Sequence, residues 1–82
     1  MKKVLITGGS GGIGAGLVRA FRKNGDEVVF TYHKNLEAAK ALAAETGATA
    51  LCADLGDSEQ VSLTVRSAAE TLGGIDVLVH AA

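Results

Sequence analysis

The stretch Thr7-Gly8-Gly9-Ser10-Gly11-Gly12-Ile13-Gly14 decides how this chain folds. It follows the apolar run Val4-Leu5-Ile6 and leads into a helical pattern that begins near Ile13. A strand, a glycine-rich turn and a helix in this order form the usual setting of a phosphate-binding loop. Glycines let backbone N–H groups approach a diphosphate without an intervening Cβ atom, and the helix N-terminus adds partial positive charge. We therefore expect every residue from Gly8 to Gly14 to contribute to a dinucleotide site.

The spacing of these glycines fits more than one pattern. Gly9-x-Gly11-x-x-Gly14 matches the general dinucleotide fingerprint, and both Gly8-x-x-x-Gly12-x-Gly14 and Gly8-x-x-Gly11-x-x-Gly14 also fit. A mononucleotide P-loop is excluded, because Ala15 and Gly16 stand where that motif needs Lys and then Ser or Thr. The alternative without a ligand is a turn whose glycines only let helix and strand pack closely.

Short apolar runs alternate with helical patterns along the whole chain, which is typical of parallel α/β folds. The expected strands are Lys3–Thr7, Glu27–Tyr32, Ala48–Ala53 and Ile75–His80. The expected helices run from about Gly12 to Asn24, from after Asn35 to Gly47, and from after Asp57 or Ser58 to Gly73-Gly74. Right-handed crossovers then place the strands in the order 3-2-1-4. The sequence predicts one domain over residues 1–82, the N-terminal half of a Rossmann-like, doubly wound α/β fold.

Each predicted helix has one apolar face that we expect to pack on the sheet. These faces comprise Ile13, Leu17, Val18 and Phe21 in the first helix, Leu36, Ala39, Leu42 and Ala43 in the second, and Val61, Val65, Ala68 and Leu72 in the third. Asn35 is an expected N-cap, and Asp57 with Gln60 fits a capping box. The fourth strand would be an apolar edge, Val77-Leu78-Val79, through which we expect copies of the chain to form a homo-oligomer.

The composition is that of an ordinary globular domain, with 48% hydrophobic and 21% charged residues. No apolar run approaches the roughly 18 residues of a membrane span, and the first strand is too short for a signal-peptide core. The net charge of −1 comes without a basic stripe, so we expect no nucleic-acid partner. The single cysteine, Cys52, lies in an apolar run and is expected to be buried. No His/Cys cluster suggests a metal site. We expect the protein to be located in the cytoplasm.

The end of the second predicted strand indicates which dinucleotide would bind. NAD-specific sites place an acidic residue there to hold the ribose 2′-hydroxyl, but this chain has Thr31-Tyr32-His33-Lys34 and no carboxylate. Lys34, with His33 or Tyr32, could instead meet a 2′-phosphate, so NADP is favoured over NAD. Asp54-Leu55 follows the third strand, where the aspartate could accept from the adenine amine. Two alternatives stay open: Lys34 is a solvated loop lysine, and Asp54 is a turn or helix-entry residue.

Three of these segments resemble the short-chain dehydrogenase/reductase family. Its loop Thr-Gly-x-x-x-Gly-x-Gly matches Thr7 to Gly14, and its adenine-binding Asp-Leu/Val pair matches Asp54-Leu55. Its fourth-strand motif is similar to Gly-Ile-Asp-Val-Leu-Val-His-Ala-Ala at residues 74–82. Within the family's classical branch, the segment Tyr32-His33-Lys34-Asn35 is similar to NADPH-dependent 3-oxoacyl-carrier-protein reductases. The resemblance implies hydride transfer between nicotinamide and a carbonyl or hydroxyl carbon, with His80, Ala81 and Ala82 beside the coenzyme.

The chain departs from the family pattern in three ways. Gly11 stands where NADPH-preferring relatives often carry an arginine, and His80-Ala81 replaces two asparagines. The family's catalytic serine and Tyr-x-x-x-Lys pair belong to sequence after residue 82, and Tyr32 has Leu36 in place of a lysine four residues on. We therefore expect no catalytic residue here, only the NADP(H)-binding portion of an oxidoreductase. The alternative is a stand-alone half-fold that self-associates and binds nucleotide weakly or not at all.

Overall fold

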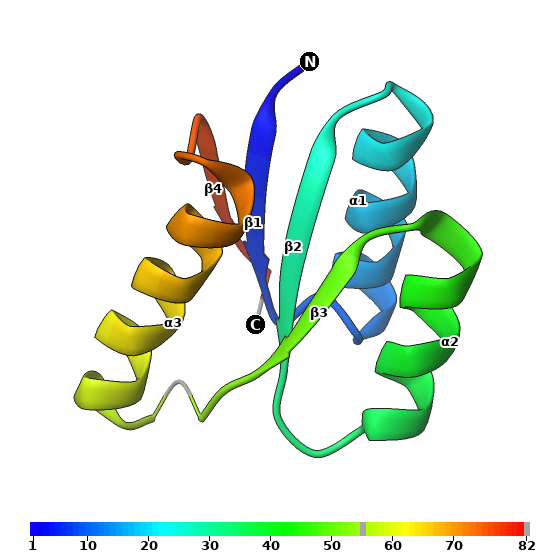
Figure 1. The fold of residues 1–82 in the computed structure, drawn as a ribbon. Coiled ribbons are helices and arrows are strands. Elements are labelled where there is room, and N and C mark those ends of the chain that lie inside the picture. Colours follow the sequence, from blue (N-terminus) through cyan, green and yellow to red (C-terminus); the bar gives the residue numbers. More distant parts are fainter. Residues whose placement is uncertain (55, 82) are drawn as a thin grey trace.

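Four parallel strands form a sheet in the order β3-β2-β1-β4 in the computed structural model, which describes residues 1–54 and 56–81. The strands are β1 (Lys3–Thr7), β2 (Glu27–Tyr32), β3 (Thr49–Cys52) and β4 (Val77–His80), and the helices are α1 (Gly12–Lys23), α2 (Leu36–Thr46) and α3 (Ser58–Leu72). Helices α1 and α2 cover one face of the sheet and α3 covers the other (Figure 1). The predicted fold class and strand order are confirmed.

The ends of several elements differ from the prediction by one or two residues. Strand β3 omits Ala48 and Ala53, and β4 begins at Val77. Asp76 belongs to the preceding turn, where its N–H donates to the Lys3 carbonyl at 2.7 Å and its carboxylate accepts from the Lys3 N–H at 2.9 Å. These bonds align β4 with β1 before the strand pairing itself begins.

The centre of the sheet is covered on both faces, as its continuous apolar runs predict. Val4, Leu5 and Ile6 of β1 are completely buried. Side chains alternate between the two faces of a strand, so Val4 and Ile6 pack with Val18 of α1 while Leu5 packs with Ala68 of α3. The fold therefore has two small cores, one on each side of β1 and β2.

Four residues that we expected to be buried are exposed. Ile13 and Leu36 are 78% and 45% exposed, because each lies in the first turn of its helix, outside the hydrophobic cores. Val65 is 39% exposed, because Thr64 takes the buried position in its place, next to Ala68 and Leu72, which are buried as predicted. Cys52 is exposed because it ends the edge strand β3.

The helix caps confirm one prediction and correct another. The side chain of Asn35 accepts from the Ala38 N–H at 3.2 Å and caps α2 as expected. Asp57 caps α3 by accepting from the Glu59 N–H at 2.9 Å. The capping box is wrong, because the Gln60 side chain accepts from the Asp54 N–H instead. Gln60 thereby ties α3 to the end of β3.

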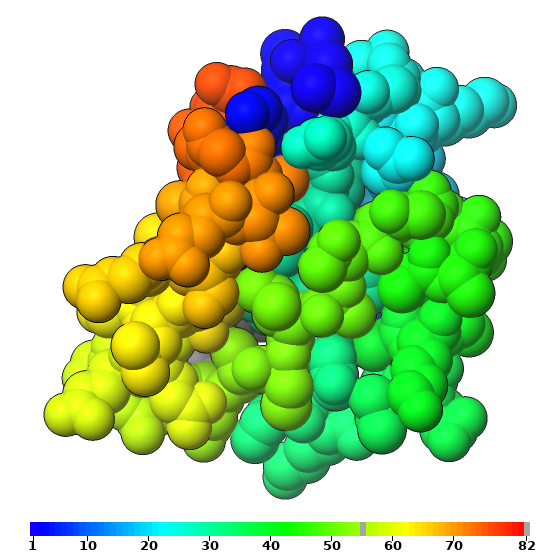
Figure 2. Space-filling model, viewed as in Figure 1, coloured from blue at the N-terminus to red at the C-terminus, as the bar shows by residue number. Residues whose placement is uncertain are grey.

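The space-filling view shows α2 and α3 on either side of β3, with the surface hollowed between β3 and α3 (Figure 2). No helix in the described part of the chain is long and apolar enough to cross a membrane. Within those same residues, no group of three or more His, Cys, Asp or Glu side chains could hold a metal ion.

Candidate functional site

The glycine loop connects the end of β1 to the start of α1, and its first two amides are already bonded. The Gly8 N–H donates to the hydroxyl of Thr31 at 2.9 Å, and the Gly9 N–H donates to the Thr31 carbonyl at 3.0 Å. Gly8 has φ +77°, a left-handed conformation that favours glycine. These bonds fix the first half of the loop against β2 and occupy the N–H groups of Gly8 and Gly9.

The first turn of α1 has backbone donors that make no hydrogen bond to the described residues. Gly11 is the N-cap and supplies no side-chain hydrogen bond, and the first turn holds no acidic residue. The first hydrogen bond of the helix runs from the Ala15 N–H to the Gly11 carbonyl at 2.7 Å, so the amides of residues 12–14 precede it. Helices α2 and α3 differ, because each has a side-chain cap and a first-turn glutamate. The start of α1 is thus suited to bind an anionic ligand, because the helix has no acidic side chain of its own there.

A Cβ atom would have different consequences at different glycines of this loop. A Cβ on Gly9 would lie 2.5 Å from Cβ of Phe30, and one on Gly14 would meet the Gly8 carbonyl oxygen and lie 2.7 Å from Cα of Gly9. Close packing therefore accounts for these two positions. A Cβ on Gly12 would meet nothing within 4 Å. Gly12 is open to solvent, where a ligand could approach the backbone.

A hollow of about 270 Å³ lies beside the loop, at the carboxyl ends of β2 and β3. Its lining residues are Gly8, Thr31, Tyr32, His33, Ala53, Asp54 and Gly56. The structure thus brings the start of the glycine loop together with Tyr32, His33 and Asp54, as the sequence predicted. Lys34 is exposed next to this group without lining the hollow. Leu55 and Ala82 lie outside the described residues.

Asp54 has a turn role that accounts for one of its carboxylate oxygens. Oδ1 accepts from the Gly56 N–H at 3.0 Å, as in an Asx turn. Oδ2 lies 3.9 Å from Nε2 of His33, and both side chains are about half exposed. The turn interpretation is therefore supported, and Oδ2 accepts no hydrogen bond from the described residues.

The end of β4 lies at the same edge of the sheet. Nδ1 of His80 is 2.7 Å from the hydroxyl of Thr7, and the Ala81 N–H donates to the Thr7 carbonyl at 2.9 Å. Sequence reasoning did not identify Thr7 and Thr31 as residues that hold the loop. A short hydroxyl side chain at the carboxyl end of each central strand was the available signal.

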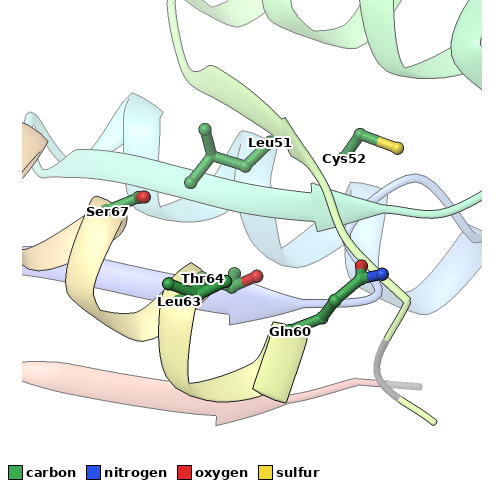
Figure 3. A pocket seen from close by; sticks show the side chains of 6 residues that line it. All are labelled: Leu51, Cys52, Gln60, Leu63, Thr64 and Ser67. Atoms are coloured by element: carbon green, nitrogen blue, oxygen red, sulfur yellow. The ribbon is translucent and has the colours of Figure 1, made fainter. Parts of the chain in front are cut away.

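A separate hollow of about 370 Å³ lies between β3 and α3 (Figure 3). Its lining residues are Leu51, Cys52, Gln60, Leu63, Thr64 and Ser67. None of them is charged at neutral pH, and the thiol of Cys52 points away from Leu63 and Thr64 (Figure 3). This hollow has hydroxyl and amide groups but no cationic side chain, so the glycine loop marks the better candidate site for a phosphate.

The sequence is similar to those of known proteins. A family model described as short chain dehydrogenase matches residues 2–82. The chain belongs to the short-chain dehydrogenase family. Among its relatives, the cyclic-di-GMP-binding biofilm dispersal mediator protein of Escherichia coli is 50% identical over 78 residues, covering 95% of this chain and 31% of that protein. An acetoacetyl-CoA reductase of Paracoccus denitrificans is 37% identical over 79 residues, covering 96% and 33%.

Solved structures of the family have the same fold. BdcA in complex with NADPH is 49% identical with a TM-score of 0.88, covering 96% of this chain and 31% of that one. A dehydrogenase/reductase from Sinorhizobium meliloti is 37% identical with a TM-score of 0.95, covering 99% and 34%. The short-chain dehydrogenase resemblance is thereby confirmed, whereas its 3-oxoacyl-carrier-protein reductase branch stays a prediction. The chain spans about a third of the length of these relatives.

Proposed function

We propose that residues 1–82 bind NADP(H) for an oxidoreductase that transfers hydride between nicotinamide and a carbonyl or hydroxyl carbon. The observation that carries the proposal is the first turn of α1, where free amides lie behind the open position of Gly12. The open space beside the backbone of Gly12, which a Cβ atom would fill, fits a diphosphate. The adjoining hollow extends toward His33 and Asp54. Family structures described as complexes with NADPH and with NADP support this coenzyme.

Each part of the coenzyme has matching residues at this edge of the sheet. The amides of residues 12–14, that of Ile13 among them, would meet the diphosphate, and Ser10 lies just before them in the loop. Oδ2 of Asp54 would accept from the adenine amine, and Lys34 with His33 would meet the 2′-phosphate by charge. His80 ends β4 and Ala81 follows it, both beside Thr7 where the glycine loop begins, and these two residues would lie next to the coenzyme ribose. The bound coenzyme would supply the hydride, and this chain would position it.

The proton donor of such a reaction would come from residues outside this chain. Tyr32 lines the hollow, but Leu36 stands four residues on, where the family pair has a lysine. Nδ1 of His80 is hydrogen-bonded to the Thr7 hydroxyl at 2.7 Å, so this side chain helps to position the start of the glycine loop. We therefore infer that residues 1–82 bind coenzyme without catalysing its reaction.

A second candidate is a half-fold that self-associates through β4 and binds nucleotide weakly or not at all. The observation that favours it is Leu78, which is 60% exposed on an edge strand. Saturable coenzyme binding by a monomer would argue against this candidate.

The test is a titration of the protein with NADPH and NADH, read by coenzyme fluorescence, for wild type, Gly12→Val and Gly16→Val. Both glycines lie in α1, and a Cβ on either would meet nothing within 4 Å. Gly12→Val should abolish saturation because its side chain would cover the free amides, while Gly16→Val, one turn later, should bind like wild type. Equal affinity of all three proteins, or no binding by wild type at millimolar coenzyme, would overturn the proposal.

A further inference from the structure

The side chain of Gln60, in the first turn of α3, reaches across to the chain that follows β3 (Figure 3). The Ala53 N–H still bonds to the sheet, donating to the Tyr32 carbonyl at 2.8 Å. The next N–H, that of Asp54, donates to Oε1 of Gln60 at 2.9 Å. A side chain of α3 therefore takes over from the sheet at the residue where the chain leaves it.

Asp54 is held at three of its atoms. Besides the N–H bonded to Gln60, its carbonyl accepts from the Asp57 N–H at 3.2 Å and its Oδ1 accepts from the Gly56 N–H at 3.0 Å. These last two bonds are local to the turn, whereas the Gln60 bond joins Asp54 to a helix side chain. Oδ2 lies 3.9 Å from Nε2 of His33, and both residues line the hollow beside the glycine loop. The position of Oδ2 thus depends on a backbone that Gln60 helps to hold.

A glutamine suits this bond, and the start of α3 does not need it as a cap. The oxygen of its side-chain amide accepts and the backbone N–H of Asp54 donates, so the two groups are complementary. Asp57 already caps α3 by accepting from the Glu59 N–H at 2.9 Å. Gln60 also lies between two hollows, because it lines the one between β3 and α3 and bonds to a residue that lines the other. Its bond to Asp54 is therefore available for a role at the coenzyme site.

We propose that Gln60 is a positioning residue for the coenzyme: without touching the coenzyme itself, it orients Asp54 so that Oδ2 accepts from the adenine amine. This rests on the proposed function and adds a residue of α3 to it. A binding group works best when neighbouring hydrogen bonds restrict its orientation. Without the Gln60 bond, the Asp54 N–H bonds to water, the turn is no longer tied to this side chain, and Oδ2 is aimed at the adenine for a smaller share of the time. The amides of residues 12–14 do not depend on this bond, so the loss is confined to the base.

The proposal predicts a loss of affinity that depends on the adenine amine. The probes are NADP and its deaminated analogue, in which a carbonyl oxygen replaces that amine. Wild type should prefer NADP, because Oδ2 can accept from the amine but is repelled by the carbonyl oxygen. Gln60→Leu removes the acceptor while keeping a side chain of similar size, and it should lower this preference by about 5-fold, the usual effect of one hydrogen bond. Gln60→Glu keeps an accepting oxygen and should restore the preference.

The experiment is isothermal titration calorimetry with both probes on wild type, Gln60→Leu, Gln60→Glu and Ser67→Ala. Ser67→Ala is the matched control, because Ser67 lines the same hollow on α3 and its hydroxyl makes no hydrogen bond within residues 1–54 and 56–81. It should keep the wild-type preference. Circular dichroism checks that each variant is folded, and Gln60→Met takes the place of a misfolded Gln60→Leu, since methionine also lacks the accepting oxygen.

The outcomes separate this inference from the function beneath it. If wild type binds neither probe, the proposed function fails and the role of Gln60 fails with it. If wild type binds NADP but the preference is the same in Gln60→Leu, or is absent from wild type, only the role of Gln60 is overturned. Equal weakening of both probes in Gln60→Leu would show a general structural role and would also overturn it. So would a Gln60→Glu protein that loses the preference as fully as Gln60→Leu does.

Discussion

The hydroxyl of Thr7 lies 2.7 Å from Nδ1 of His80 and joins the ends of β1 and β4 where the glycine loop begins. The two residues are also partners in the strand register. Gly8, the next residue, is held from the other side by the Thr31 hydroxyl at 2.9 Å. Because glycines add no side-chain contacts of their own, the loop takes its position from hydroxyl groups on two neighbouring strands.

Loss of the Thr7–His80 bond should weaken the fold measurably. We expect Thr7→Val to lower the free energy of unfolding by about 1 kcal/mol, the usual net value of one hydrogen bond, in urea denaturation. His80→Ala should cost a similar amount, and the double variant little more, because both changes remove the same bond. Thr49→Val is the control, since Thr49 is an exposed strand threonine with no side-chain bond among the described residues. Fully additive losses would contradict a direct bond.

Alanine substitutions at Gly12 and Gly14 should differ in their effect on stability. The added methyl of Gly14→Ala would meet backbone atoms of Gly8 and Gly9, which cannot move aside as a flexible side chain can. We expect a loss of about 1–3 kcal/mol in the free energy of unfolding, as for other overpacked sites. Gly12→Ala meets nothing and should keep or slightly raise stability. Thermal unfolding measures both effects, and equal destabilisation would show that the two glycines have the same role.

This contrast marks how far the sequence alone could lead. The glycine pattern predicts a phosphate loop, but it does not separate the packing glycines Gly9 and Gly14 from the open Gly12. That distinction depends on Phe30, a residue of the next strand, and on backbone atoms within the loop. Spacing along the chain holds no information about such contacts.

The order of the strands could be predicted from the sequence more reliably than the burial of individual helix residues. Continuous apolar runs such as Val4-Leu5-Ile6 identify central strands, and their order follows from right-handed crossovers. The prediction that Ile13 is buried was wrong, because helical periodicity does not indicate which turns of a helix lie outside the core. The prediction that Val65 is buried was also wrong, because the polar residue Thr64 takes the inward position, and a pattern of apolar residues cannot indicate this.

Acid should destabilise the protein in part through Asp26. Its side chain accepts from the Lys2 N–H at 2.8 Å and from the Asn24 amide at 3.2 Å, and these bonds, the Lys2 bond foremost, lower the pKa of Asp26 below its ordinary value. A lowered folded-state pKa gives stability that is fully present above the unfolded value, near pH 4, and is lost as the pH falls through the folded value. Asp26→Asn should therefore lose less stability than wild type between pH 5 and acidic pH in urea denaturation. Glu70→Gln, at an exposed carboxylate without an ion pair among the described residues, should behave like wild type.

The exposed edge of β4 should drive association between copies. Among the described residues, strand β4 pairs only with β1, so its other edge has backbone groups without a strand partner there, next to Leu78, which is 60% exposed. We expect light scattering of wild type to show dimers or larger species that dissociate on dilution, and Leu78→Lys to shift the population toward monomer by placing a charge on the edge. Leu63→Lys is the matched control, because Leu63 is 59% exposed but lies on α3, where no backbone edge is free. A wild type that stays monomeric at high concentration would contradict pairing through β4, and equal effects of both lysines would assign the association to apolar contact in general.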